Sequence, residues 1–217
     1  VKQSKDVTTE MKLVILGAGF SGQRVASLAR NTGIHTLCSR RKREKKGTDF
    51  VFDSTNNLFP SEQILEGATH ILSCIPPTLE GTDPVLSSIG ETLKKLPWQW
   101  VGYMSTTGVY GDQEGNWVNE EDEPKPGQPR SKRRLACEKL WEKSGLPIQI
   151  LRLPGIYGPG RSAIDSLANG NSKMVHKPGQ VFSRVHIDDI AGAIIYLIQL
   201  ALKGRRPKII NIADNLP

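Results

Sequence analysis

A glycine-rich turn between two apolar segments constrains this chain more than any other feature. Residues 12–16 form a short strand-like run, Gly17-Ala18-Gly19-Phe20-Ser21-Gly22 follows at once, and the next residues have the apolar spacing of a helix. In such a unit the glycines allow a tight turn, the close approach of a diphosphate, and packing of helix on strand. The free amides of the helix start attract the anion. We therefore predict a dinucleotide site, with an ordinary tight turn as the alternative; its predicted residues are Gly17, Gly19, Phe20, Ser21 and Gly22.

Apolar runs without polar alternation recur along the whole chain. Strand-like runs lie at 34–38, 50–52, 71–75, 100–104, 148–153 and 208–212, and helix-like segments at 84–96, 130–143 and 189–203. Such runs favour strands buried on both faces, hence a mostly parallel sheet covered by helices on both faces. The predicted fold class is α/β, a doubly wound sheet of the Rossmann type.

The predicted domain organisation is simple. The length of 217 residues and 37% hydrophobic content indicate one globular unit. We expect residues 1–10 to be a flexible lead-in, 11–217 to be a single dinucleotide-binding domain, and 156–183 to supply a small substrate-side segment. A continuation beyond Pro217 is left open.

Composition also indicates the kind of cellular compartment in which the protein works. The longest apolar run, Ile190–Leu202, contains Gln199 and is too short to cross a bilayer, so a soluble protein is expected. The three cysteines Cys38, Cys74 and Cys137 are far apart within apolar runs, which favours reduced thiols in the cytoplasm or another reducing soluble compartment such as an organelle stroma. Their spacing predicts no metal site.

The net charge of +7 is concentrated in two clusters, residues 40–46 and 130–134. Local clusters of cations indicate local anions. The sequence offers no finger, zipper or basic stripe interleaved with aromatic residues, so nucleic acid is disfavoured as a partner. A small molecule bearing phosphate is the expected ligand.

The end of the second strand predicts which dinucleotide binds. Chains that bind NAD usually place an acid there, against the ribose 2′-hydroxyl. Here the strand ends in Cys38-Ser39-Arg40-Arg41, without an acid. A hydroxyl and a guanidinium suit a 2′-phosphate, so Ser39 and Arg40 favour NADP over NAD, with a solvated surface turn as the alternative.

Other candidates for the cofactor site follow later strands. Asp53 comes just after the third strand, where it could bond the adenine amino group or cap a turn. Ser73, Cys74 and Ile75 end the fourth strand and are expected to line the crevice in which open α/β sheets bind ligands.

Four passages together resemble one family. They are Gly17 to Gly22, the run Ser105-Thr106-Thr107-Gly108-Val109-Tyr110-Gly111, the run Arg152-Leu153-Pro154-Gly155-Ile156-Tyr157-Gly158-Pro159-Gly160, and Val185-His186-Ile187-Asp188-Asp189. In order and spacing they resemble the short-chain dehydrogenase/reductase superfamily, in particular its extended branch, the NAD-dependent epimerase/dehydratase family. The resemblance also implies that Pro154 lies beside the cofactor.

The resemblance implies a Ser or Thr, a Tyr and a Lys acting beside the nicotinamide. Thr106 matches the Ser/Thr position, but the Tyr-x-x-x-Lys pair is absent. If Glu138 is matched to the glutamate that often follows the lysine, Arg134 falls at the lysine position and Arg130 at the tyrosine position. Arginine cannot donate a proton near neutral pH because its pKa is above ~12. The chain therefore resembles atypical members of the superfamily with an altered catalytic set.

Tyrosines near the expected site are the candidates to replace the missing acid. The resemblance places Tyr110 in the pocket, where it would act with Thr106 and Arg134 as the catalytic set. Tyr110 and Tyr157 could instead be half-buried fillers with satisfied hydroxyls. His186 precedes an acidic helix start and is expected to be structural.

Two functions remain open from the sequence. The first is an NADP-dependent epimerase, dehydratase or reductase acting on a small polar carbonyl or sugar-type substrate. The second is a non-catalytic NADP(H)-binding sensor or scaffold. The resemblance also implies a possible homodimer, paired through helices that include residues 130–143.

Overall fold

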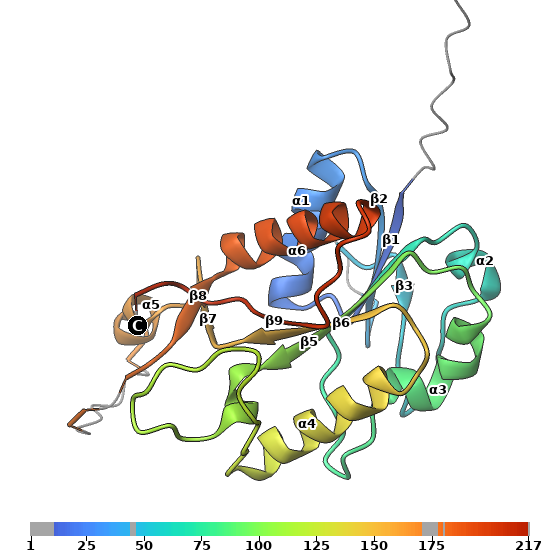
Figure 1. Ribbon diagram of the computed structural model, residues 1–217. Coiled ribbons are helices and arrows are strands. Elements are labelled where there is room, and N and C mark those ends of the chain that lie inside the picture. Colours follow the sequence, from blue (N-terminus) through green and yellow to red (C-terminus); the bar gives the residue numbers. More distant parts are fainter. Residues whose placement is uncertain (1–10, 44–46, 171–177, 180, 217) are drawn as a thin grey trace, which may run out of the picture.

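A parallel sheet of seven strands forms the centre of the computed structural model, which describes residues 11–43, 47–170, 178–179 and 181–216 (Figure 1). The strand order is β3-β2-β1-β4-β5-β6-β9, and every neighbouring pair is parallel. The strands are β1 (Lys12–Leu16), β2 (His35–Arg40), β3 (Phe50–Val51), β4 (His70–Ser73), β5 (Trp100–Thr106), β6 (Ile148–Leu153) and β9 (Ile209–Asn211). The predicted doubly wound α/β fold is confirmed.

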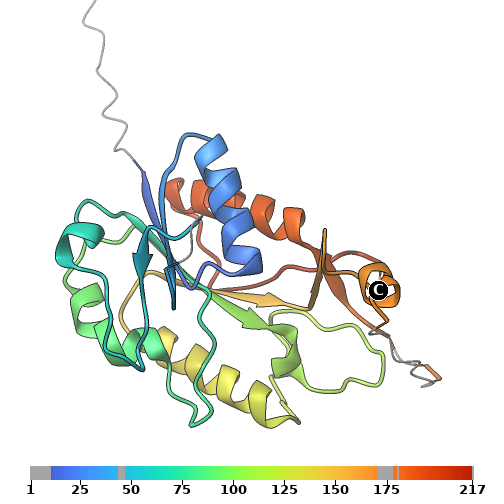
Figure 2. The same ribbon diagram turned by 180° about the vertical axis from the view of Figure 1, so that it is seen from behind.

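Helices cover both faces of this sheet (Figures 1 and 2). Helices α1 (Phe20–Asn31) and α6 (Ile187–Leu202) pack on one face, and α3 (Pro84–Lys94) and α4 (Pro129–Glu142) on the other. The two resulting cores contain the alternate side chains of β1: Leu13 and Ile15 face α1, whereas Val14 and Leu16 face the opposite core. Burial on both faces explains why the strands appear in the sequence as unbroken apolar runs.

Sequence patterns missed the short elements. These are α2 (Glu62–Leu65), the 3-10 helix η1 (Thr107–Tyr110), α5 (Ala163–Ala168), and a separate two-stranded parallel sheet of β7 (Gly155–Tyr157) and β8 (Arg184–His186). Elements of three to six residues show too few turns or alternations for a periodic signal. The expected lead-in 1–10 lies outside the described residues, as do 171–177 and 180 of the expected substrate-side segment.

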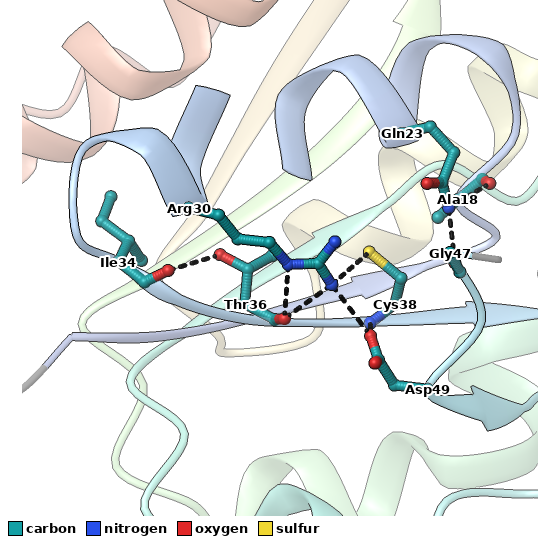
Figure 3. A network of polar contacts seen from close by, with 8 residues as sticks. All are labelled: Ala18, Gln23, Arg30, Ile34, Thr36, Cys38, Gly47 and Asp49. Carbon is teal, nitrogen blue, oxygen red and sulfur yellow. Dashed lines mark hydrogen bonds and ion pairs between the residues drawn. The ribbon is translucent and has the colours of Figure 1, made fainter. Parts of the chain in front are cut away.

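Side chains from α1 and the loop before β3 protect the outer edge of β2 (Figure 3). Arg30 donates from Nε and Nη2 to the carbonyl of Thr36, and Nη2 also lies 3.0 Å from Asp49 Oδ2. Asp49 Oδ2 accepts from the backbone N–H of Cys38 at 2.7 Å, and its own N–H donates to the Cys38 carbonyl at 2.9 Å. Because β3 pairs only with the last two residues of β2, this network replaces the missing strand.

Within the part of the chain that the structure covers, no helix is both long and apolar enough to cross a membrane. Cys38, Cys74 and Cys137 form no disulfide. The described residues contain no group of three or more potential metal ligands.

Replacing Asp49 by Ala should lower the free energy of unfolding by about 1–3 kcal/mol, because the buried N–H of Cys38 loses its acceptor. Urea denaturation measures the loss. Asp49→Asn keeps an oxygen acceptor and loses only the ion pair with the exposed Arg30, so it should cost less. Glu66→Ala, at an exposed position, should stay within about 0.5 kcal/mol of wild type. Equal stabilities for Asp49→Ala and Glu66→Ala would contradict this role for Asp49.

Candidate functional site

The order of the strands locates a crevice at the carboxyl end of β1. The chain runs outward from β1 to β2 and β3 on one side, and from β4 to β5 and β6 on the other. Ligands of open α/β sheets bind where the strand order reverses in this way. The glycine turn lies at this point, between the end of β1 and the start of α1.

The glycines at 17 and 22 are required by close packing. Gly17 has a φ of +74°, and a Cβ there would lie 2.5 Å from Cγ1 of Ile75 on the segment after β4. A Cβ at Gly22 would lie 3.2 Å from Ile15 and 3.3 Å from Cys74, so this glycine lets α1 approach the sheet closely. These two contacts match the first and third glycine functions predicted from the sequence.

Gly19 has a different environment. A Cβ at this position would meet only the carbonyl oxygen of Gly17, at 3.9 Å, so the space in front of the turn is open. Gly19 is the N-cap of α1 and offers no side-chain cap, and the first turn of the helix contains no acid. The open space and the uncompensated positive end of the helix suit a diphosphate.

Ser39 stabilises this turn from the neighbouring strand. Its hydroxyl accepts from the N–H of Gly17 at 3.0 Å, and its carbonyl accepts from the N–H of Ala18 at 2.7 Å. The side chain is fully buried. The predicted contact of Ser39 with a 2′-phosphate is therefore corrected: this residue holds the turn in shape, because a hydroxyl engaged and buried there does not face a ligand.

The predicted basic residues end β2 and begin the following loop. Arg40 is half-buried, whereas Arg41, Lys42 and Arg43 are exposed. Gln23 on α1 links this loop to the glycine turn, since its Nε2 donates to the carbonyls of Ala18 and Gly47 at 3.2 and 2.6 Å (Figure 3). The carboxyl end of β2 is thus positively charged and fixed to the turn.

Asp53 stabilises a turn after β3. Its carboxylate accepts from the N–H of Thr55 at 3.0 Å and from Nδ2 of Asn56 at 2.7 Å. The side-chain hydrogen bond from Asn56 is the main reason that the pKa of Asp53 is lowered. These bonds match the turn-capping alternative weighed from the sequence.

A cavity of about 200 Å³ opens beside the glycine turn. Its wall combines the turn with the ends of β4, β5 and β6 and the segments that follow them. The lining residues are Gly17, Gly19, Phe20, Ser21, Gly22, Cys74, Met104, Ser105, Arg134, Leu153, Ile156 and Arg161. All five turn residues predicted from the sequence are among them, together with Cys74 and Arg134, whereas Ser73, Ile75 and Pro154 are not.

Arg134 projects from α4 to the end of β5. Its Nη1 donates to the hydroxyl of Tyr103 at 3.1 Å and to the carbonyl of Met104 at 3.0 Å, and the guanidinium lies 5.5 Å from the centre of the Tyr103 ring. Burial raises the pKa of Tyr103, so its hydroxyl stays protonated. The sequence matched Arg134 to the lysine position of the family, and the structure places it in the cavity wall.

Ser105 is a cavity residue that the sequence analysis missed. Its hydroxyl donates to Oε1 of Glu138, and both oxygens of Glu138 accept from Arg152, at 3.2 Å from Nε and 2.8 Å from Nη2. The side chains of Glu138 and Arg152 are each 2% exposed. Because the charge of Glu138 is stabilised by Arg152, the Ser105 proton is committed and its oxygen remains an acceptor.

Neither candidate tyrosine reaches the cavity. Tyr110 is 1% exposed, its hydroxyl donates to Asn211 Oδ1 at 2.9 Å, and the guanidinium of Arg152 lies 4.8 Å from its ring centre. The Tyr157 hydroxyl donates to Asp214 Oδ2 at 3.0 Å. The predicted role of Tyr110 as a catalytic pocket residue is therefore corrected, because its buried hydroxyl donates its hydrogen bond to Asn211 and does not face the cavity.

Thr106 and His186 cap helices. Thr106 is half-buried at the end of β5, outside the cavity lining, and its hydroxyl oxygen accepts from the N–H of Gly108 at 3.1 Å. His186 is the N-cap of α6, where its Nδ1 accepts from the N–H of Asp188 at 3.3 Å. The structural interpretation of His186 agrees with this geometry. Thr106 remains next to the cavity through its neighbour Ser105.

A comparison with known families supports the resemblance found in the sequence. The model of the NAD dependent epimerase/dehydratase family matches residues 13–213. The chain belongs to this family. Proteins of known structure share its fold.

Two solved structures and one curated protein illustrate the relationship. A functionally unknown conserved protein from Silicibacter pomeroyi DSS is 32% identical, with a TM-score of 0.83 over 95% of this chain and 73% of that chain. The UDP-glucuronic acid 4-epimerase of Bacillus cereus, solved with UDP-glucuronic acid and NAD, is 19% identical, with a TM-score of 0.71 over 94% and 78% of the two chains. The uncharacterized protein y4nG of Sinorhizobium fredii is 30% identical over 111 residues, which cover 43% of this chain and only 26% of y4nG.

Glu138→Gln should lower the free energy of unfolding by about 3–5 kcal/mol, because it leaves the charge of Arg152 buried without a counter-charge. Thermal and urea denaturation would measure the effect. Glu142→Gln removes the same charge from an exposed site on the same helix and should change stability by less than about 0.5 kcal/mol. If both variants unfold at the same point, the pair does not stabilise the fold as described.

Proposed function

We propose that this chain binds a nicotinamide dinucleotide at the glycine turn, with NADP(H) preferred over NAD(H), and acts on a small polar carbonyl or sugar-type substrate in the adjoining cavity. The observation that carries the proposal is the open, uncompensated helix start at Gly19, joined to a cavity that reaches the ends of β4, β5 and β6. The relative from Bacillus cereus that shares this fold was solved with NAD.

The preference for NADP(H) rests on charge at the end of β2. Arg40 ends that strand, and the exposed Arg41, Lys42 and Arg43 follow it directly. The strand end carries no acid to bind a ribose 2′-hydroxyl. Since the adenosine half lies on the β2 side of the crevice, a 2′-phosphate would meet this positive charge. Ser39 no longer contributes to this argument.

The catalytic set would differ from the usual one. Bound nicotinamide supplies or accepts a hydride. Within the cavity wall Arg134 is a fixed cation, and Ser105 is an acceptor that orients a hydroxyl or N–H of the substrate. Thr106 keeps its hydroxyl proton free of the bond to Gly108 and can donate it to a substrate oxygen. Burial raises the pKa of Cys74, so this thiol does not act as a thiolate, and water is left to carry the proton.

One observation favours a second candidate, a non-catalytic sensor of NADP(H). The hydroxyls of Tyr110 and Tyr157 both bond side chains outside the cavity. Among the described residues, no tyrosine lines the cavity. A family member without a tyrosine at its reacting centre can keep the cofactor fold and lose the chemistry.

Coenzyme binding tests the first part of the proposal. NADPH fluorescence titration should show binding that is weakened roughly tenfold or more by Gly19→Val, because the new side chain fills the space meant for the diphosphate without meeting another part of the fold. Gly192→Val, at an exposed position of α6, provides the matched control and should bind as wild type. NADP should bind more tightly than NAD, and Arg40→Glu should remove the difference. Equal binding by the two glycine variants would reject the site, and a preference for NAD would reject the choice of coenzyme.

Product analysis separates the enzyme from the sensor. Incubation with NADPH or NADP⁺ and a panel of keto-sugars, aldehydes and nucleotide sugars should yield a reduced, oxidised or epimerised product, and Arg134→Gln should reduce its formation. Mass spectrometry and NMR detect all three outcomes, including an epimerisation that consumes no coenzyme. Tight coenzyme binding with no product from any substrate would instead support the sensor.

A further inference from the structure

We propose that Arg134 binds an anionic group of the substrate, a carboxylate or a phosphate, at the end of β5. This inference rests on the proposed function, because it names the substrate class of the same cavity. It assigns Arg134 to substrate recognition rather than to the coenzyme ribose that the lysine of related enzymes holds.

The guanidinium of Arg134 is fixed before any ligand arrives. Nη1 uses its hydrogens on the hydroxyl of Tyr103 and the carbonyl of Met104, both neutral acceptors. The cation also lies over the Tyr103 ring, at 5.5 Å. The N–H groups of Nε and Nη2 are not used by these bonds, and a guanidinium presents its donors in a rigid fork. A preorganised fork in a cavity wall is suited to two parallel bonds with a carboxylate or phosphate.

Among the residues that the structure describes, no carboxylate lies in direct contact with the positive charge of the cavity wall. Two of the lining residues are the arginines Arg134 and Arg161, and the lining contains no Asp or Glu. Among the residues that the structure describes, neither arginine forms an ion pair; Arg161 instead lies over the ring of Phe20, at 5.3 Å. Arg134 is half-buried and has only neutral partners, and a cation in this state favours the entry of an anion.

Buried carboxylates near α4 are already committed elsewhere. Glu138 accepts from Ser105 and Arg152. Asp83 caps α3 through the N–H groups that follow it and accepts from Nε1 of Trp141 at 2.8 Å. Neither carboxylate is available to move toward Arg134 without leaving another buried group unsatisfied.

The coenzyme does not supply the missing anion at this place. The start of α1, beside Phe20 and Arg161, would hold its diphosphate, and β4 lies between β1, which precedes that helix, and β5. The 2′-phosphate of NADP belongs on the opposite side, at the end of β2. Arg134 bonds the carbonyl of Met104, the residue before Ser105, so it lies on the nicotinamide side of the cavity. The anion that it binds must therefore come from the substrate.

Ser105 adds a second requirement at the same strand end. With its proton given to Glu138, its oxygen can only accept a hydrogen bond from the ligand. A donor fork and an acceptor next to each other fit a hydroxy acid or a hydroxyl-bearing phosphate better than a neutral carbonyl compound.

Calorimetry with small anions tests this inference without turnover. Oxalate and inorganic phosphate serve as the anionic probes and oxamide as the neutral isostere of oxalate, each titrated into the full chain with and without saturating NADP⁺. Wild type should bind at least one anion and bind oxamide more weakly. Arg134→Gln should weaken anion binding roughly tenfold or more, because a charge-assisted fork is lost. Arg134→Lys, which keeps the charge and loses the fork, should give an intermediate loss. Tighter binding of oxalate would identify the group as a carboxylate, and tighter binding of inorganic phosphate would identify it as a phosphate.

Lys139→Gln is the control, since it removes one positive charge from an exposed position on the same helix and should leave anion binding unchanged. The affinity of Arg134→Gln for NADPH, measured by titration, should differ from that of wild type by less than threefold. A large loss of NADPH binding with unaltered anion binding would assign the fork to the ribose and overturn the inference. So would oxalate and oxamide binding with equal, measurable affinity, or the absence of binding by both oxalate and phosphate. If the coenzyme fails to bind but the anion effect of Arg134→Gln persists, the proposed function fails and the anion site stands. Should Arg134→Gln not fold, Arg134→Lys decides the same question.

Discussion

Close packing at the glycine turn is the constraint on which the rest of the site depends. Gly17 has room for no side chain against Ile75, and Gly22 lets α1 approach both β1 and Cys74. Ser39 then fixes the turn from β2 through its hydroxyl and its carbonyl. The ends of β1 and β2 and the segment after β4 thus all contact the turn. This packing, and not a flexible loop, holds the amides of α1 facing the cavity.

A second constraint is the distribution of charge across α4. On its buried side Glu138 and Arg152 neutralise each other, and both carboxylate oxygens are occupied. On the cavity side Arg134 has only neutral partners. One helix therefore contributes a closed ion pair to the core and an open cation to the cavity. The first links the helix to β5 and β6, and the second leaves a positive charge in the cavity wall.

The fold and the glycine turn could be predicted from the sequence because both rest on local patterns, apolar runs without alternation and a turn between strand and helix. The finer details depend on three-dimensional contacts. Ser39 appeared to be a ligand group because only its position after the strand was visible, whereas its hydrogen bond to Gly17 joins residues 22 positions apart. Tyr110 lost its predicted role to Asn211, which is 101 positions away. Ser105 was missed because two adjacent hydroxyl residues end β5, Ser105 and Thr106, and only the three-dimensional structure shows which one faces the cavity. The sequence did contain a signal for the ion pair beside Ser105. Arg152 lies within the apolar run of β6, and a buried arginine requires a carboxylate partner.

Asp214 links the last described part of the chain to the small sheet beside the cavity. Its N–H donates to the carbonyl of Arg184, and its carboxylate accepts from Tyr157 and from the N–H of His186. Ile156, which lines the cavity, lies in the strand that these bonds hold in place. Because the chain leaves the ribosome N-terminus first, the glycine turn emerges early, whereas the bonds by which Asp214 holds β7 and β8 form only near the end of synthesis.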